Sequence, residues 1–277
     1  MASLARSKSY ARFLRRFGLK HAAWLGDYCR FREVGLIAEA LVGRPVRGLL
    51  DVGCAGTLFP HYAAFLLPDA RVVGIDSEAN LALAPERILG VAARAGENER
   101  VRIFAADARS LPFPDAAFEA VTAISVLEHI RGDGDRAAVR EMLRVLRPGG
   151  LLALSVPMAA RAEEHEGDPS CPYFIRRYDD RTLAERLIDP AADARLIVRR
   201  DFGERRFPYS HIYMKLRAAQ ERWLARGAAW KPLRYGAWAA LAATPLAARL
   251  FLRVWDPADP AARRRIPGGT VVILEKR

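Results

Sequence analysis

The sequence predicts an α/β fold in which an open, mostly parallel sheet carries helices on both faces. Three observations lead to this prediction. Short apolar runs alternate with longer helical segments over residues 46–202, as is typical of parallel sheets. The first three apolar runs contain or end in an acidic residue. A turn of small residues, 53–56, joins the first of these runs to a helix.

The first strand and its turn are predicted by GLLDVGCAGTLFP, residues 48–60. Residues 49–52 read as a short buried strand, residues 53–56 as the turn, and Thr57 as the cap of a helix over residues 61–67. A strand, a small-residue turn and a helix start together form a site for anions and nucleotides. Small residues suit the turn because such a ligand lies directly on the backbone. A tight turn without a ligand is the alternative.

The segments that follow complete the predicted core. The second strand ends in an acid at about the distance downstream at which nucleotide folds place a carboxylate on ribose hydroxyls. The further strands are expected at residues 71–76, 101–107, 118–124, 151–156, 194–202 and 270–275. Helices are expected at residues 79–95, 136–146 and 178–187, the last capped by Asp179 or Asp180. A turn is expected at 147–150, and loops at 111–115 and 158–177.

Four motifs resemble those of a known family. LLDVGCAG, VVGID, AADARSLPFPDAAFEAVTAISVLEHI and LRVLRPGGLLALSVP are similar, in order and spacing, to motifs of class I S-adenosylmethionine-dependent methyltransferases, and most similar to the type 11 group that acts mostly on small molecules. The resemblance covers residues 46–157. A dinucleotide dehydrogenase would share only the first two motifs. The chain departs from the family at Ala55, where glycine is usual, and the extra methyl group narrows the room beside the methionine end of the cofactor.

The resemblance implies a Rossmann-like, seven-stranded sheet, mostly parallel with an antiparallel last strand. It divides the chain into an N-terminal helical cap segment (1–45), an S-adenosylmethionine-binding core (46–202), a helical insertion (203–268) and the final strand of the core (269–277).

The same resemblance implies S-adenosylmethionine as the cofactor and gives each acid a role. Asp51 would lie near the methionine amine, Asp76 would accept hydrogen bonds from the ribose hydroxyls, and Asp107 would accept one from the adenine amino group. The alternative for Asp76 and Asp107 is capping of strand-end turns. The expected cofactor-binding residues are Asp51, Gly53, Cys54, Ala55, Gly56, Asp76, Ser77, Asp107, Ala108, Ser125 and Leu127, of which Ser125 and Leu127 would face the sulfonium.

A sulfonium carries its methyl group already activated, so the reaction needs neither a metal nor a covalent intermediate. An oxygen nucleophile needs a base, most often histidine. His129 is the candidate catalytic base, with the alternative that the Glu-His pair only orders its loop; His165 and Tyr178 are weaker candidates. Metal binding by His165 and its acidic neighbours is conceivable, but a solvated loop is favoured and no metal is predicted.

Cysteine content and charge limit the other possibilities. Three widely spaced cysteines give neither a disulfide framework nor a zinc motif, so a cytoplasmic protein with reduced thiols is expected. Residues 1–48 contain 10 Lys or Arg and 3 Asp or Glu, residues 49–194 contain 16 and 23, and residues 195–277 contain 18 and 6. The flanks are therefore basic, which suits an anionic surface or substrate, or else reflects an arginine-rich solvated face.

Two segments raise the question of membrane contact. The spacing of apolar residues in 1–20 predicts a basic amphipathic helix without features of a secretory signal, and packing on the domain is favoured over a membrane surface. Tyr10, His21, Trp24 and Tyr28 would then line the entrance to the cofactor cleft. In the insertion, the uninterrupted apolar run 235–243 is far shorter than the ~20 residues of a bilayer span. Its tryptophans and arginines suit a substrate cap or an interfacial hairpin.

The sequence thus predicts an enzyme that methylates a small-molecule or lipid-linked acceptor by direct in-line displacement, with O- or C-methylation favoured over N-methylation. It would be cytoplasmic, with peripheral contact at the inner membrane surface as an option. A membrane-surface protein that binds the cofactor but has lost turnover is the alternative. An RNA methyltransferase is a second alternative, against which the chain has no Asn/Asp-Pro-Pro-Tyr motif and no recognisable RNA-binding module. The sequence predicts neither the acceptor nor the oligomeric state.

Overall fold

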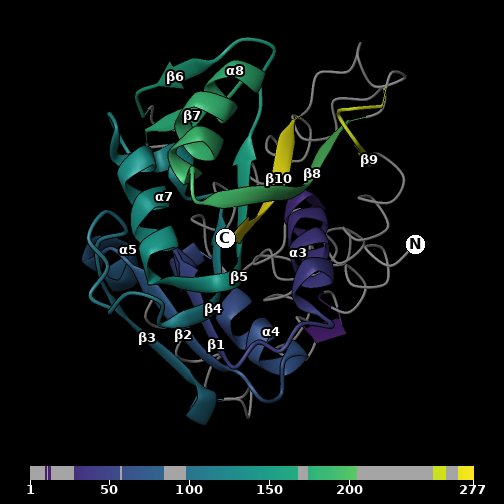
Figure 1. The fold of residues 1–277 in the computed structure, drawn as a ribbon. Coiled ribbons are helices and arrows are strands. Elements are labelled where there is room, and N and C mark those ends of the chain that lie inside the picture. Colours follow the sequence, from purple (N-terminus) through teal and green to yellow (C-terminus); the bar gives the residue numbers. More distant parts are fainter. Residues whose placement is uncertain are drawn as a thin grey trace, which may run out of the picture.

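The computed structural model describes residues 10, 12–13, 28–56, 58–83, 98–167, 174–204, 252–259 and 268–277. An eight-stranded sheet with the order β3-β2-β1-β4-β5-β10-β8-β9 forms its centre (Figure 1). The strands are β1 (Gly48–Val52), β2 (Arg71–Asp76), β3 (Val101–Ala105), β4 (Phe118–Ile124), β5 (Leu146–Pro157), β8 (Ala194–Glu204), β9 (Leu252–Trp255) and β10 (Gly269–Lys276). The helices are α3 (Tyr28–Leu41), α4 (Phe59–Leu66), α5 (Glu78–Leu83), α7 (Gly134–Val145) and α8 (Asp180–Leu183), which continues as a π-helical turn, Ala184–Ile188.

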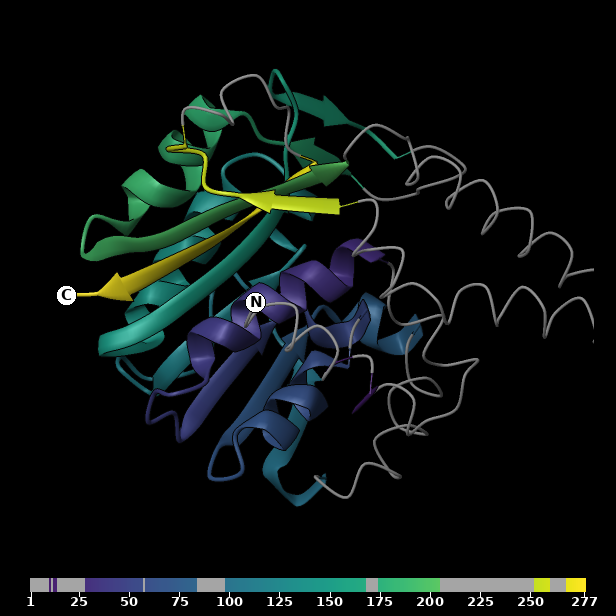
Figure 2. The ribbon, with the colours of Figure 1, turned by 90° about the vertical axis from the view of Figure 1, so that its right-hand side faces the viewer.

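The strand directions confirm the predicted fold class. The pairs β1–β2, β1–β4, β2–β3 and β4–β5 are parallel, and β10 runs antiparallel to both β5 and β8. The predicted number of seven strands is wrong, because β9 adds an antiparallel eighth strand beside β8 (Figure 2). Since β9 lies within the segment 203–268, this segment is not wholly helical. The sequence of β9, LRVW, is too short to show a helical or a strand periodicity, so pairing with β8 decides its structure.

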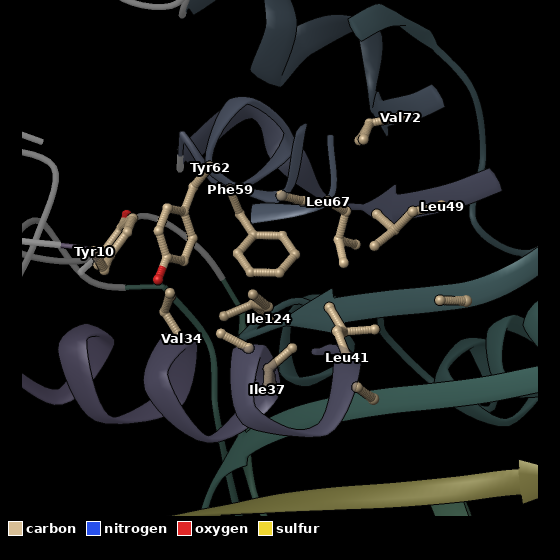
Figure 3. Close-up of a cluster of buried hydrophobic side chains, with 14 of the residues drawn as sticks. Tyr10, Val34, Ile37, Leu41, Leu49, Phe59, Tyr62, Leu67, Val72 and Ile124 are labelled. Carbon is tan, nitrogen blue, oxygen red and sulfur yellow. The ribbon is translucent and has the colours of Figure 1, made fainter. Parts of the chain in front are cut away.

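Both faces of the sheet are buried, because alternate side chains of each central strand point to opposite faces. The face towards α3 and α4 carries Leu49, Ala120, Leu151 and Val271. The face towards α7 carries Leu50, Val121, Leu152 and Val272. Figure 3 shows Val34, Ile37 and Leu41 of α3 directed towards Phe59 and Tyr62 of α4.

Four local expectations need correction or remain outside the description. The expected turn 147–150 is instead a bulged start of β5, where the pairing shifts from Leu146 to Leu151 opposite β4 and Gly149 has a φ of +75°. Within the expected loop 158–177, β6 (Glu163–His165) and β7 (Ile175–Arg177) form a hairpin. Helix α4 follows Leu58, which provides no side-chain cap, and Thr57 lies outside the described residues. Helix α5 is described only to Leu83.

The N-terminal residues that the structure describes belong to the core. Tyr10 and Phe13 are fully buried, and their rings contact the ring of Tyr62 with centroids 4.9 and 5.4 Å away. The prediction that Tyr10 lines a cleft entrance is therefore wrong, because its ring fills the space between α3 and α4. His21 and Trp24, the side chain of Tyr28 and residues 205–251 lie outside the described part. No helix in the described ranges is long and apolar enough to cross a membrane.

Candidate functional site

The carboxyl ends of β1, β2 and β4 meet at one edge of the sheet, and the turn after β1 lies between the other two. Gly53 donates its N–H to the carbonyl of Ile75 at 2.7 Å. Its φ is +80°, and a Cβ at this position would lie 2.1 Å from a methyl carbon of Val126. Only glycine satisfies both conditions, so Gly53 brings the β1 turn against the loop that follows β4.

Two acids at this edge, Asp51 and Asp76, are buried. Asp51 accepts a hydrogen bond from the Thr122 hydroxyl at 2.6 Å, and burial, together with the charge of Asp76, raises the pKa of Asp51 to about 7. Asp76 accepts hydrogen bonds from the backbone N–H of Ala55 at 2.8 Å, its neighbour Ser77 at 2.8 Å and the Asn80 amide at 2.7 Å. The structure therefore brings together Asp51, Asp76, Ser77 and the small-residue turn, as the sequence predicts.

The chemistry of these two acids fits S-adenosylmethionine. Among the described residues, neither carboxylate has a cationic side chain within salt-bridge distance. Buried carboxylates without an ion pair suit a ligand that supplies an ammonium group and a pair of hydroxyls. Asp76 receives three of the roughly four hydrogen bonds that a carboxylate accepts, so a ribose diol would have to displace a protein donor or share an oxygen with it.

Asp107 differs from these two acids. Strand β3 ends at Ala105, so Asp107 lies beyond it, half-exposed, in a short turn with Ser110. Its carboxylate accepts hydrogen bonds from the Arg109 backbone and from the Arg109 side chain, whose Nη2 lies at 2.7 Å, and this pairing lowers the pKa of Asp107. The described contacts of Asp107 are those of turn capping, and its role towards adenine stays a prediction. Ala108 is partly buried against the apolar cluster beneath α7.

The loop after β4 contacts an acid that the sequence reasoning missed. Ser125 has a φ of +53°, and its hydroxyl lies 3.3 Å from the Glu33 carboxylate of α3. Arg30 holds this carboxylate at 3.1 Å and donates to the Ile124 carbonyl at 3.2 Å. The sequence signal for Glu33 is its spacing. It lies four residues before Ile37 and eight before Leu41, so it shares the buried face of α3 with them.

Glu128 and His129 follow in a 3-10 turn (Leu127–His129). Glu128 is buried and its Oε2 has no hydrogen-bond partner among the described residues; burial raises the pKa of Glu128 to about 8. Its Oε1 lies 4.0 Å from Nε2 of His129. His129 Nδ1 lies 2.8 Å from the carbonyl of Phe174, and 40% of the His129 side chain is exposed. His129 therefore combines a fixed ring with access to solvent.

Other predicted site residues lie elsewhere. The Tyr178 hydroxyl donates to Asp135 at 2.9 Å. Burial, and after it the charge of Asp135, raises the pKa of Tyr178, which argues against a role as base. His165 lies exposed on β6, 3.4 Å from Glu163. Cys54 and Leu127 lie in the two loops of the site itself and are fully buried there, and their role towards the cofactor stays a prediction. Within the described residues, no three His, Cys, Asp or Glu side chains cluster as metal ligands would.

Comparisons with known proteins agree with this architecture. Residues 50–154 match a family model described as a methyltransferase domain. The chain is 37% identical over 143 residues to a 27-O-demethylrifamycin SV methyltransferase of Amycolatopsis mediterranei (strain S699), covering 49% of this chain and 50% of that relative. It is 38% identical over 161 residues to a ubiquinone/menaquinone biosynthesis C-methyltransferase of Ectopseudomonas mendocina (strain ymp), covering 54% and 56%. The chain thus spans about half the length of the curated relatives it matches.

Solved structures share the fold. The crystal structure of the [4+2]-cyclase SpnF matches with a TM-score of 0.52 and 24% identity, covering 89% of this chain and 82% of that one. A SAM-dependent methyltransferase from Methanosarcina mazei matches with a TM-score of 0.52 and 15% identity, covering 87% and 96%. At these identities the likeness shows the fold alone, and one of the two proteins is named a cyclase.

Proposed function

We propose that the protein transfers a methyl group from S-adenosylmethionine to a small-molecule or lipid-linked acceptor, because residues 50–154 match a methyltransferase-domain model and relatives that are 37% and 38% identical are named methyltransferases. The observation that carries the proposal is the pair of buried strand-end carboxylates, Asp51 and Asp76, beside the Gly53 turn.

The residues of the chain have separable tasks in this proposal. Asp76 would bind the ribose hydroxyls of the donor and Asp51 its ammonium group. When bound, the donor supplies a methyl group that is already activated on a sulfonium. His129 would accept the proton of the acceptor at Nε2, because the neighbouring carbonyl of Phe174 accepts a hydrogen bond and therefore requires the proton on Nδ1.

The acceptor class is supported by the named activities of the curated relatives. One relative is named for methylation at an oxygen and another for C-methylation in quinone biosynthesis. O- or C-methylation by this chain is therefore preferred to N-methylation. Both kinds of acceptor require proton removal, which gives His129 a function in either case.

Calorimetry with S-adenosylmethionine tests the proposal. We expect micromolar binding by the intact protein and its loss in Asp76→Ala. Asp115→Ala is the matched control, since the Asp115 side chain is 78% exposed and, among the described residues, its ion pair is with Arg144. Absence of heat with the intact protein would refute the proposal, as would unchanged affinity in Asp76→Ala. Transfer of a labelled methyl group to an extracted metabolite pool would then identify the acceptor fraction.

Ala55 favours a second candidate, a protein that binds the cofactor but has weak or no turnover. Its methyl group stands where the resembling family usually has glycine, and its backbone N–H, which glycine would also carry, donates to Asp76 Oδ2 at 2.8 Å, an oxygen that the ribose would use. The fold is also compatible with other chemistry, as a cyclase with this fold shows. Repeated turnover to a methylated product by the intact protein would eliminate this candidate.

Peripheral contact with an anionic membrane is part of the same proposal. It is supported by the basic balance of residues 195–277 and by the tryptophans and arginines of the insertion. Flotation with vesicles that contain or lack anionic lipid tests it. Equal recovery with both kinds of vesicle would reject an electrostatic contact.

A further inference from the structure

We propose that Arg176 is a positioning residue that holds the His129 ring in the tautomer with a proton on Nδ1 and the lone pair on Nε2. The role of His129 as a base rests on the proposed function above. The positioning itself rests on contacts of Arg176 that are independent of any activity.

The tautomer follows from the hydrogen-bond acceptor that lies next to Nδ1. His129 Nδ1 lies 2.8 Å from the carbonyl oxygen of Phe174, which can only accept a hydrogen bond. A neutral imidazole has one N–H, so a proton on Nδ1 leaves Nε2 as the atom that accepts a proton. The Phe174 carbonyl therefore favours Nε2 as the basic nitrogen of His129, whereas Glu128 Oε1, 4.0 Å from Nε2, is the group that would favour a proton there.

Arg176 ties together the two segments that form this hydrogen bond. It lies two residues after Phe174 on β7, and its side chain is only 4% exposed. From there Nη1 donates to the carbonyl of Ile130 at 3.3 Å, and Nη2 donates to the carbonyl of Gly132 at 2.9 Å. Ile130 directly follows His129, so one guanidinium fixes the backbone on both sides of the hydrogen bond.

A buried acid holds the guanidinium in turn. Asp135 is fully buried and accepts from Arg176 Nη1 at 2.7 Å and from the Tyr178 hydroxyl at 2.9 Å. Arg176 Nε donates to Glu164 of β6 at 2.7 Å. The planar guanidinium thus directs three nitrogens to four acceptors, and the single ammonium of lysine cannot reproduce this geometry.

The ring of Phe174 is fixed by the same group of residues. The guanidinium carbons of Arg131 and Arg176 lie 5.0 and 5.4 Å from its centroid. These distances are within the range of cation–π attraction. Arg131 and His129 belong to the same segment, and they contact the ring and the carbonyl of Phe174 respectively.

Nitrogen NMR of histidine-labelled protein tests the positioning without any acceptor or cofactor. The chain contains five histidines, and His129→Gln identifies the His129 signals. At about pH 8.5, where an ordinary imidazole is neutral, we expect mainly the Nδ1–H tautomer at His129. In Arg176→Lys we expect the share of the Nε2–H tautomer to rise several-fold.

Arg186→Lys is the matched control. Arg186 also binds Asp135, with Nε at 2.8 Å and Nη2 at 2.7 Å, and like Arg176 it donates to the Gly132 carbonyl. Among the described contacts it does not reach the Ile130 carbonyl, and it lies outside β7, the strand that follows Phe174. We expect Arg186→Lys to weaken the ion pair with Asp135, as Arg176→Lys does, and to keep the wild-type tautomer of His129. Thermal unfolding of both variants reports any general loss of structure.

Three results would overturn the inference. The first is an Nε2–H tautomer at His129 in the unmodified protein, which needs no variant to fold. The second is an unchanged tautomer in folded Arg176→Lys, and the third is an equal change in Arg186→Lys. A protein that binds no S-adenosylmethionine would refute the proposed function and leave the tautomer result standing, so the two failures are distinguishable.

Discussion

His61 offers a quantitative test of the packing beneath the site. It lies in the first turn of α4 and is only 2% exposed. Neither of its ring nitrogens has a hydrogen-bond partner among the described residues. Burial without a partner disfavours the charged imidazolium and lowers the pKa of His61 from an ordinary 6.5 to about 4.

The sign and size of the effect on stability follow from this pKa. Above pH 6.5 the ring is neutral in both states, and its burial carries no pH-dependent cost. As the pH falls below 6.5, the unfolded chain takes up a proton that the folded protein does not, so the folded state loses stability until the pH reaches about 4. At pH 5 the loss attributable to His61 is about 2 kcal/mol, at roughly 1.4 kcal/mol per pH unit.

Urea unfolding of wild type and His61→Leu at pH 7.5 and pH 5 measures this contribution. At each pH we take the unfolding free energy of His61→Leu minus that of wild type. We expect this difference to be about 2 kcal/mol more positive at pH 5 than at pH 7.5, because only wild type loses stability through His61. His165→Leu is the control, because the His165 side chain is 59% exposed and should give no such increase. Parallel losses of stability in wild type and His61→Leu would refute the assignment of His61 as a buried, neutral and unpaired ring.

Three other substitutions test the loops and the buried ion cluster. Burial raises the pKa of Glu128 from 4.5 to about 8, so the folded state loses stability as the pH rises from about 4.5 to about 8 and no further above it; Glu128→Gln should gain roughly 2–3 kcal/mol over wild type between pH 6 and pH 9 in urea unfolding. Gly53→Ala places a methyl group 2.1 Å from Val126 at a φ of +80°, and calorimetric unfolding should show a loss of about 3 kcal/mol. Asp135→Ala removes the buried acid that pairs with Arg176 and Arg186, and urea unfolding should show that the free energy of unfolding falls by about 3–5 kcal/mol.

The sequence predicted the central part of the sheet well, because its strands are buried on both faces and therefore apolar throughout. The bounds of β2 and β4 agree with the prediction, and β10 has the predicted antiparallel direction. Edge elements were harder to predict. Strand β9 and the β6–β7 hairpin are short and have little period of their own, so pairing with neighbours decides them.

The candidate site shows the same division. Asp51 and Asp76 were predictable because an acid at the end of an apolar strand has a fixed place at one edge of a parallel sheet. Asp107 was less predictable, since its pairing with Arg109 depends on where β3 ends and how the chain turns afterwards. Glu33 and Ser125 are 92 residues apart in the chain, so no local sequence pattern could have predicted their contact.

By itself, the sequence determined the α/β class, the order of the strand-end acids and the position of the turn at Gly53, because these depend on local periodicity and on the backbone freedom of glycine. Only the tertiary structure decided the protonation pattern of the site. Burial makes Asp51 and Glu128 weak acids, and the Phe174 carbonyl, held by Arg176 and Asp135, places the proton of His129 on Nδ1. The physical reason is that desolvation and hydrogen bonding depend on which groups from distant segments pack together, and these contacts exist only in the folded chain.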